Sequence, residues 1–238
     1  MFLVFDDRRS DSPWIERVWR SRSERHGEFH SVAACHWELV VSRCERTTSV
    51  LVRGPETYAT VAECPADGEW FAIRFKLGTY MPALDPGRVR DRSDVVLASG
   101  RIGTFHLDGS SWELPTFENA EVFVQRLVRR GIIVADADVQ ATVRGEPPRL
   151  HPRTAQRRFL QVTGLSHAAI VQIERARRAA ALLTAGTPIL DVVAEAGYYD
   201  QAHLTRSLGR LAGLTPAQLL RTRPQLSFLY KTNEEGDR

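Results

Sequence analysis

The chain has 238 residues, 43% of them hydrophobic, which is enough for one large domain or two modest ones whose cores need no disulfides. No apolar run reaches the roughly 20 residues of a membrane helix, and the apolar N-terminal run is too short for a signal peptide. Three irregularly spaced cysteines, Cys35, Cys44 and Cys64, do not form the pattern of a disulfide framework. We therefore expect a cytoplasmic protein with no membrane segment.

Charge is distributed unevenly along the chain. Residues 1–143 carry 18 Lys and Arg against 21 Asp and Glu, whereas residues 144–224 carry 12 against 5. Residues 225–238 carry 2 against 3. A basic second part beside a mildly acidic first part is typical of a nucleic-acid-binding domain attached to another domain, although a solvated basic surface has the same composition.

The first part of the chain is predicted to be mostly β. Within the charged first 30 residues, Trp14, Ile15, Val18 and Trp19 have the spacing of a short helix. From about Phe29 to Phe75, the runs "HWELVVSR", "TTSVLVRG", "TYATVAEC" and "EWFAIRF" are separated by turn signals such as "PADG". Short strands at this spacing predict a sandwich or barrel.

A helix then closes the first domain. Its apolar residues recur at i, i+3, i+4, i+7 and i+8, and Gly131 can end it: Ala120, Phe123, Val124, Leu127, Val128. Composition and charge change near "VRGEPPRLHP", where two prolines cannot continue a helix. We expect a β-rich regulatory domain at 1–135, an all-α domain at 136–224 and a tail at 225–238.

The stretch "ILDVVAEAGYYDQAHLTRSL", residues 189–208, reads as two short helices joined at Gly197. Asp200 can begin the second helix, which buries Leu204, Leu208 and Leu211. Its opposite side presents residues suited to base edges: Gln201, Ala202, Thr205 and Arg206. Gln can pair with adenine, Arg with guanine, and the Ala and Thr methyls can touch thymine. The pattern predicts a helix-turn-helix.

An upstream stretch, "HPRTAQRRFLQVTGLS" at 151–166, has the same organisation. Its outer face offers Arg153, Gln156 and Arg157. Between the two units, residues 167–185 read as a linker helix. We expect its basic residues Arg175, Arg177 and Arg178 to make phosphate contacts at most.

These motifs make the region resemble the DNA-binding domain of the AraC/XylS family of bacterial transcription regulators. The resemblance rests above all on "GYYDQAHLTRSLGRLAGLTP" and covers about 138–222. It implies two helix-turn-helix units whose second helices enter successive major grooves of an operator. The matching contact positions are the seven outer-face residues named above. The first unit departs from the family pattern, because its leading helix is short and runs into two prolines and His151 stands where a Ser cap is usual.

The first domain resembles the cupin-like effector domains of one AraC-like subgroup, through "WELVVSR", "VRGPETYA", "FAIRFKLGTYMP" and "WELPTFENAEVFV". The resemblance implies an effector or regulatory domain but does not say what it senses, and it leaves open a small-molecule effector, contact with RNA polymerase in the case of an activator, and dimerisation. Trp37, Glu38, Trp70 and Arg74 are candidate effector-binding residues. Strand alternation also permits a simpler interpretation, in which the Trp side chains are core and the charges are exposed.

Two alternative functions would need other residue patterns. A cupin-type metalloenzyme needs closely spaced His ligands and a carboxylate, and no His-x-His, phosphate loop or nucleophile elbow occurs. A metal or redox sensor would use Cys35, Cys44 and Cys64, with His36, but their spacing matches no compact zinc motif and favours buried thiols. We therefore expect a regulator that is not an enzyme, with no cofactor and no metal site.

Overall fold

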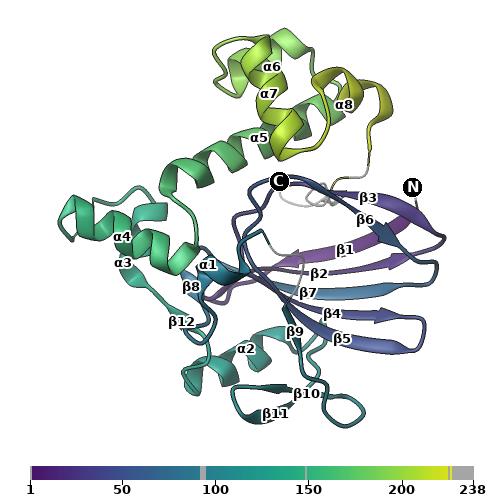
Figure 1. Cartoon of the computed structure of the whole chain (residues 1–238), viewed down its shortest axis with the longest axis vertical. Helices are drawn as coiled ribbons and strands as arrows, with labels where there is room; N and C mark the ends of the chain where they lie inside the picture. The colour runs from purple at the N-terminus through teal and green to yellow at the C-terminus, as the bar shows by residue number, and fades with distance from the viewer. Residues whose placement is uncertain (1, 92–94, 148, 225, 227–238) are drawn as a thin grey trace, which may run out of the picture.

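The computed structural model describes residues 2–91, 95–147, 149–224 and 226 (Figure 1). The strands are β1 (Leu3–Arg9), β2 (Ile15–Ser23), β3 (Gly27–Ser31), β4 (Glu38–Cys44), β5 (Thr47–Arg53), β6 (Thr60–Cys64), β7 (Glu69–Phe75), β8 (Thr79–Tyr80), β9 (Val95–Leu97), β10 (Thr104–Leu107), β11 (Ser110–Glu113) and β12 (Val134–Ala135). The helices are α1 (Pro86–Val89), α2 (Ala120–Arg129), α3 (Ala137–Val143), α4 (Pro152–Thr163), α5 (His167–Ala185), α6 (Ile189–Glu195), α7 (Gln201–Leu211) and α8 (Pro216–Thr222).

A β-rich region therefore precedes a helical region, as predicted. The main element of the β-rich region is a six-stranded antiparallel sheet in the order β1-β2-β7-β4-β5-β9. Strands β1 and β9 are its edges, so this sheet does not close into a barrel. The β3–β6 ribbon lies across the sheet on the side that faces α5 to α8, while α2 lies on the other side (Figure 1). Of the two predicted architectures, the arrangement is closer to a sandwich.

Period-two alternation gives the sheet two different faces. In β7, Phe71, Ile73 and Phe75 point into an apolar core that α2 covers with Phe123 and Leu127. The intervening side chains of the strand point toward the β3–β6 ribbon, where Ala72 packs in a smaller cluster around Trp19 and Val40. One face is thus fully packed and the other is only partly filled.

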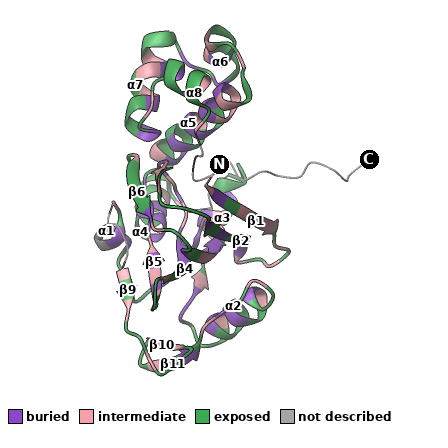
Figure 2. Cartoon of the chain, turned by 90° about the vertical axis from the view of Figure 1, so that its right-hand side faces the viewer, coloured by how far each residue is buried: buried purple, intermediate pink, exposed green. Residues whose placement is uncertain are grey.

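The helical region has its own core, built from the inward faces of α4 to α8 (Figure 2). Ile170, Ile173, Ala176, Ala180 and Leu183 of α5 are buried, as their spacing predicts. Three residues from the loop before β4, Val32, Ala33 and Cys35, belong to this same core. The β-rich and helical regions are therefore joined by apolar packing, not only by the chain connection.

The helix predicted around Trp14–Trp19 is wrong, because these residues lie in β2 or immediately before it. The pairing of β2 with β7 is irregular between Ile15 and Arg17, where Glu16 is an extra residue. A bulge shifts the alternation by one position, so Ile15 and Val18 face the same core at a helix-like spacing of three. Most of the predicted tail at 225–238 lies outside the described residues; Leu226 is buried and bridges to His30.

Candidate nucleic-acid interface and buried cavity

The α6–α7 pair has the geometry of a helix-turn-helix. Gly197 takes a positive φ of 68°, which only glycine adopts without strain. Asp200 is extended and its side chain accepts a hydrogen bond from the backbone N–H of His203 at 2.6 Å, so it caps the start of α7. Leu204 and Leu208, on the inner face of α7, are fully buried. The turn and the angle of α7 are therefore fixed by local interactions.

The outer face of α7 is open to solvent where the sequence predicted it. Gln201, Ala202 and Arg206 are exposed, whereas Thr205 is half-buried and its hydroxyl donates to the carbonyl of Gln201 at 2.8 Å. Beside the start of the helix, Tyr199 is 92% exposed, a residue that sequence reasoning passed over. An aromatic side chain this accessible at the entry of a recognition helix is a further candidate for contact with DNA.

The first unit, α3–α4, also forms, although its leading helix is short. Asp136 caps α3 by accepting from the backbone N–H groups of Asp138 and Val139. Its second carboxylate oxygen accepts from Nε of Arg158 on α4 at 2.6 Å, which ties the two helices together. The predicted contact residues all lie on the exposed side of α4: Arg153, Gln156, Arg157.

The linker helix α5 differs from expectation at two of its three basic residues. Arg175 stacks over the ring of Tyr198 at 4.6 Å and donates to the carbonyl of Gly197 at 3.2 Å, so it supports the turn of the second unit. Arg177 is buried and donates to the carbonyl of Ala33 in the first domain. Of the three, Arg178 is exposed and available for a phosphate.

Comparison with known proteins bears on this region. The family profile described as a helix-turn-helix domain matches residues 149–222, which span α4 to α8. These residues are an AraC-type helix-turn-helix domain. The chain is accordingly a DNA-binding transcription regulator with an additional N-terminal domain.

Curated proteins give no match. Two solved structures of ToxT from Vibrio cholerae are similar over most of their length. One is at 8% identity and a TM-score of 0.37, covering 93% of this chain and 98% of that one. The other, apo ToxT with one substitution from strain SCE256, is at 9% identity and a TM-score of 0.35, covering 93% and 97%. Among the described residues, no helix is long and apolar enough to cross a membrane.

The AraC-type domain is hydrogen-bonded to the β-rich domain through the end of α7. The carbonyl of Leu211 accepts from the backbone N–H of Ala33 at 2.8 Å, and that of Arg210 accepts from Ala59 at 3.0 Å. The last carbonyls of a helix have no partner within the helix, so here the first domain satisfies two of them. The recognition helix is thereby in direct backbone contact with the loops before β4 and β6.

A cavity of about 400 Å³ lies between the six-stranded sheet and the β3–β6 ribbon. Its lining includes three of the four predicted effector residues, Glu38, Trp70 and Arg74. Trp37 is buried in the opposite core under α2 and does not reach it. Sequence reasoning missed Arg53, Glu56 and Arg177 in this lining. Arg53 and Glu56 lie at and just beyond the end of β5, whereas Arg177 comes from α5, over 100 residues away in the chain.

Glu38 and Arg74 are buried in the cavity wall, so the interpretation in which these charges are exposed is wrong. Arg74 Nε donates to Glu38 Oε1 at 2.7 Å, and the indole N–H of Trp19 donates to the same oxygen at 3.3 Å. Burial opposes ionisation of Glu38, but Arg74 and Arg53 together with these hydrogen bonds outweigh it and lower its pKa. The β3–β6 ribbon is what covers this face of the sheet.

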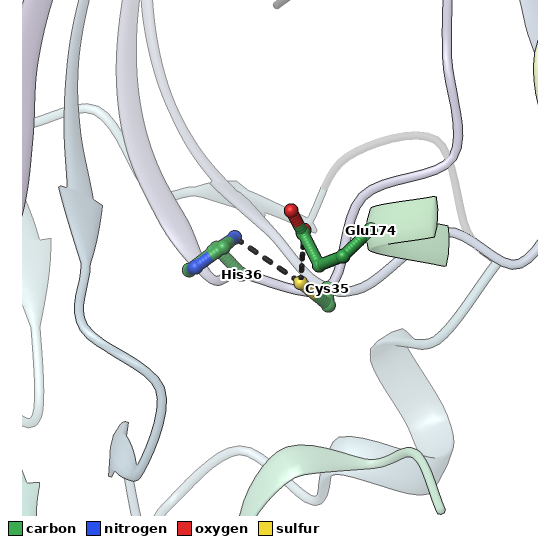
Figure 3. Close-up of side chains that lie close together, drawn as sticks. All are labelled: Cys35, His36 and Glu174. Atoms are coloured by element: carbon green, nitrogen blue, oxygen red, sulfur yellow. Dashed lines mark hydrogen bonds between the residues drawn. The ribbon is translucent and has the colours of Figure 1, made fainter. Parts of the chain in front are cut away.

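A second polar cluster lies where the two domains meet. Cys35 Sγ is 3.0 Å from Glu174 Oε1 on α5 and 3.4 Å from Nδ1 of His36 (Figure 3). Burial, together with the nearby Glu174 carboxylate, raises the pKa of the Cys35 thiol well above its usual value. Burial and the charges of Arg74 and Arg177 lower the pKa of His36. Cys44 and Cys64 are not part of this cluster among the described residues, so the structure does not bring together the three cysteines of the alternative sensor.

Proposed function

We propose that this protein is a cytoplasmic regulator that reads a specific operator with α4 and α7, under the control of its β-rich domain. The observation that carries the proposal is the exposed polar face of α7 within an AraC-type domain. Gln201 and Arg206 are the residues we expect to pair with bases, with Ala202 and Thr205 supplying methyl contacts. Arg153, Gln156 and Arg157 would do the same, or bind phosphates, in the adjacent groove.

Control by the first domain is supported by the hydrogen bonds from Ala33 and Ala59 to the end of α7. We place the proposed domain boundary between residues 135 and 136, just before α3. A small-molecule effector in the 400 Å³ cavity would contact Glu38, Trp70 and Arg74, and also Arg177 on the linker helix. Contact with RNA polymerase stays a prediction for the case of an activator, and dimerisation stays open.

Selection of genomic fragments tests this function. The full chain would be mixed with fragmented genomic DNA, and the bound fragments would be sequenced. We expect one enriched motif with two half-sites about one helical turn apart, and affinity that falls steeply as salt rises. Recovery of fragments without a shared motif, or no recovery, would overturn the proposal of sequence-specific binding.

A further inference from the structure

The junction cluster brings together three different metal-binding groups. Cys35 supplies a thiol, His36 a ring nitrogen and Glu174 a carboxylate oxygen, and these three atoms lie within 4.8 Å of one another (Figure 3). Cys35 and His36 come from the segment before β4, whereas Glu174 is on α5. The three donors therefore converge only because the two domains are packed together.

The two separations that involve the Cys35 sulfur are near those of a tetrahedral zinc site. With Zn–S near 2.3 Å and Zn–N or Zn–O near 2.1 Å, tetrahedral donors are about 3.4–3.6 Å apart. The Sγ to Nδ1 distance of 3.4 Å already fits, and the Sγ to Oε1 distance of 3.0 Å needs to open by about half an ångström. Glu174 has 49% of its side chain exposed, so a small rotation of its carboxylate is unhindered.

Glu16 completes the surroundings of His36. Its Oε2 is 3.1 Å from Nε2, the ring nitrogen opposite the one that faces Cys35, although not in line for a hydrogen bond. Metal-ligating histidines commonly have a carboxylate at this second nitrogen, because it fixes the tautomer and the ring orientation. Glu16 is the extra residue of the β2 bulge, a feature that re-aims a side chain.

Two arginines near the cluster carry positive charge, which opposes a cation. Each has a carboxylate beside it: Arg74 pairs with Glu38, and Arg177 Nε is 3.8 Å from Glu174 Oε1. With a thiolate at Cys35, the carboxylates of Glu16 and Glu174 add further negative charge around the ion, which offsets the charge of the two arginines.

We propose that Cys35, His36 and Glu174 form a zinc site that clips the β-rich domain to the linker helix of the DNA-binding domain. The thiol proton leaves to solvent as the Zn–S bond forms, and a water completes the tetrahedron. His36 and Arg177 also line the cavity, which gives the ion a route in. Because α5 joins the two helix-turn-helix units, the clip fixes their position relative to the first domain.

The test uses the full chain, stripped with a chelator and then titrated with zinc by calorimetry, with cobalt as a spectroscopic substitute. We expect one zinc per chain, a rise in the melting temperature with zinc concentration, and a thiolate-to-cobalt absorption band. Glu174→Gln and Cys35→Ser should each weaken zinc binding at least about 100-fold, and Glu16→Gln about 10-fold. Because Glu174 is half-exposed, we expect the Glu174→Gln chain to fold, so that weaker zinc binding by this variant reports on the lost ligand.

Cys44→Ser and Cys64→Ser are the matched controls and should bind zinc as the unchanged chain does. No stoichiometric binding, or binding retained by both Cys35→Ser and Glu174→Gln, would overturn the proposal. Binding lost in a control variant would assign the metal to other thiols and overturn it as well. Operator affinity measured in the presence of chelator tests the proposed function separately. If the proposed function is right, a chain without this zinc site still binds DNA.

Discussion

Glu38 and Arg74 form a buried ion pair in the wall of the cavity, both less than one-tenth exposed. A buried pair contributes little net stability, but removing one member leaves the other charge desolvated without its closest counter-ion. The pair is therefore retained at some cost, which is typical of a site that recognises a charged or polar ligand group.

Glu38→Ala should lower the free energy of unfolding by about 3 kcal/mol at neutral pH, because Arg74 loses the carboxylate that it contacts most closely. Chemical denaturation of the two chains measures the difference. Glu28→Ala, which removes an exposed carboxylate from β3, should change it by less than about 0.5 kcal/mol. If Glu38→Ala and Glu28→Ala lower the free energy of unfolding by the same small amount, the Glu38–Arg74 pair is not desolvated.

At the scale of single residues, the sequence identified candidate residues of the cavity better than it predicted what packs around them. The sequence named Glu38, Trp70 and Arg74 as candidates without assigning them to one face; in the structure, β4 and β7 bring them to the same cavity. The sequence could not show that this face of the sheet is covered, because the cover is the β3–β6 ribbon, whose strands pair Gly27 with Cys64 although β4 and β5 lie between them in the chain. Likewise Cys35, His36 and Glu174 meet through domain packing, which no local pattern encodes.

The start of the recognition helix α7 is stabilised by a capping hydrogen bond at Asp200. Asp200→Ala removes the side-chain acceptor of the His203 N–H and should cost about 1 kcal/mol of stability in the helical domain. Asp200→Asn keeps an acceptor and should cost only a few tenths of that. Thermal unfolding of both variants checks the order, and equal losses would show that Asp200 acts through charge and not as a cap.

Helix α2 is fastened to the edge of the sheet by an ion pair. Arg8 on β1 donates to both oxygens of Glu121, and Ser10 donates to one of them. The hydrogen bonds from Arg8 lower the pKa of Glu121 to about 2. A depressed carboxyl pKa stabilises the fold above the unfolded value, and the stabilisation is lost as pH falls toward the folded value.

Glu121→Gln should therefore reduce stability by about 1 kcal/mol at pH 7, a discounted figure because both side chains are about one-third exposed. The difference should shrink as pH falls from about 4.5 to about 2, since the carboxylate of the unchanged chain becomes protonated in that range. Urea unfolding at a series of pH values measures it, with exposed Glu113→Gln as the control. A difference independent of pH would contradict this account.

At the scale of elements, periodicity predicted the helices well, since α5 and α7 bury the residues that it indicated and α2 buries all of them except Val128, which is partly buried. It failed at β2, where the bulge at Glu16 imitates helical spacing. It also undervalued α3, whose stability comes from Asp136 and its contact with Arg158, an interaction across 22 residues.

Across the whole molecule, the two domains share a core and a set of hydrogen bonds. Val32, Ala33 and Cys35 pack among the helices, and two backbone N–H groups of the first domain meet the end of α7. A change in the cavity or at the junction therefore acts directly on the helix that we propose reads DNA. Coupling between the cavity and α7 requires contacts that differ between two states of the protein. The shared core and the two hydrogen bonds to the end of α7 are the contacts placed to differ in this way.

The central claim is that α7 reads bases through Gln201 and Arg206. Its most direct test is equilibrium binding of the full chain to the selected operator and to duplexes with each base pair changed in turn. Gln201→Ala and Arg206→Ala should each cost about 1–3 kcal/mol and lose discrimination at one base pair. Gln125→Ala and Arg129→Ala, which change the same residue types on exposed positions of α2, should bind as the unchanged chain does. Full affinity and full discrimination in both α7 variants would contradict the claim.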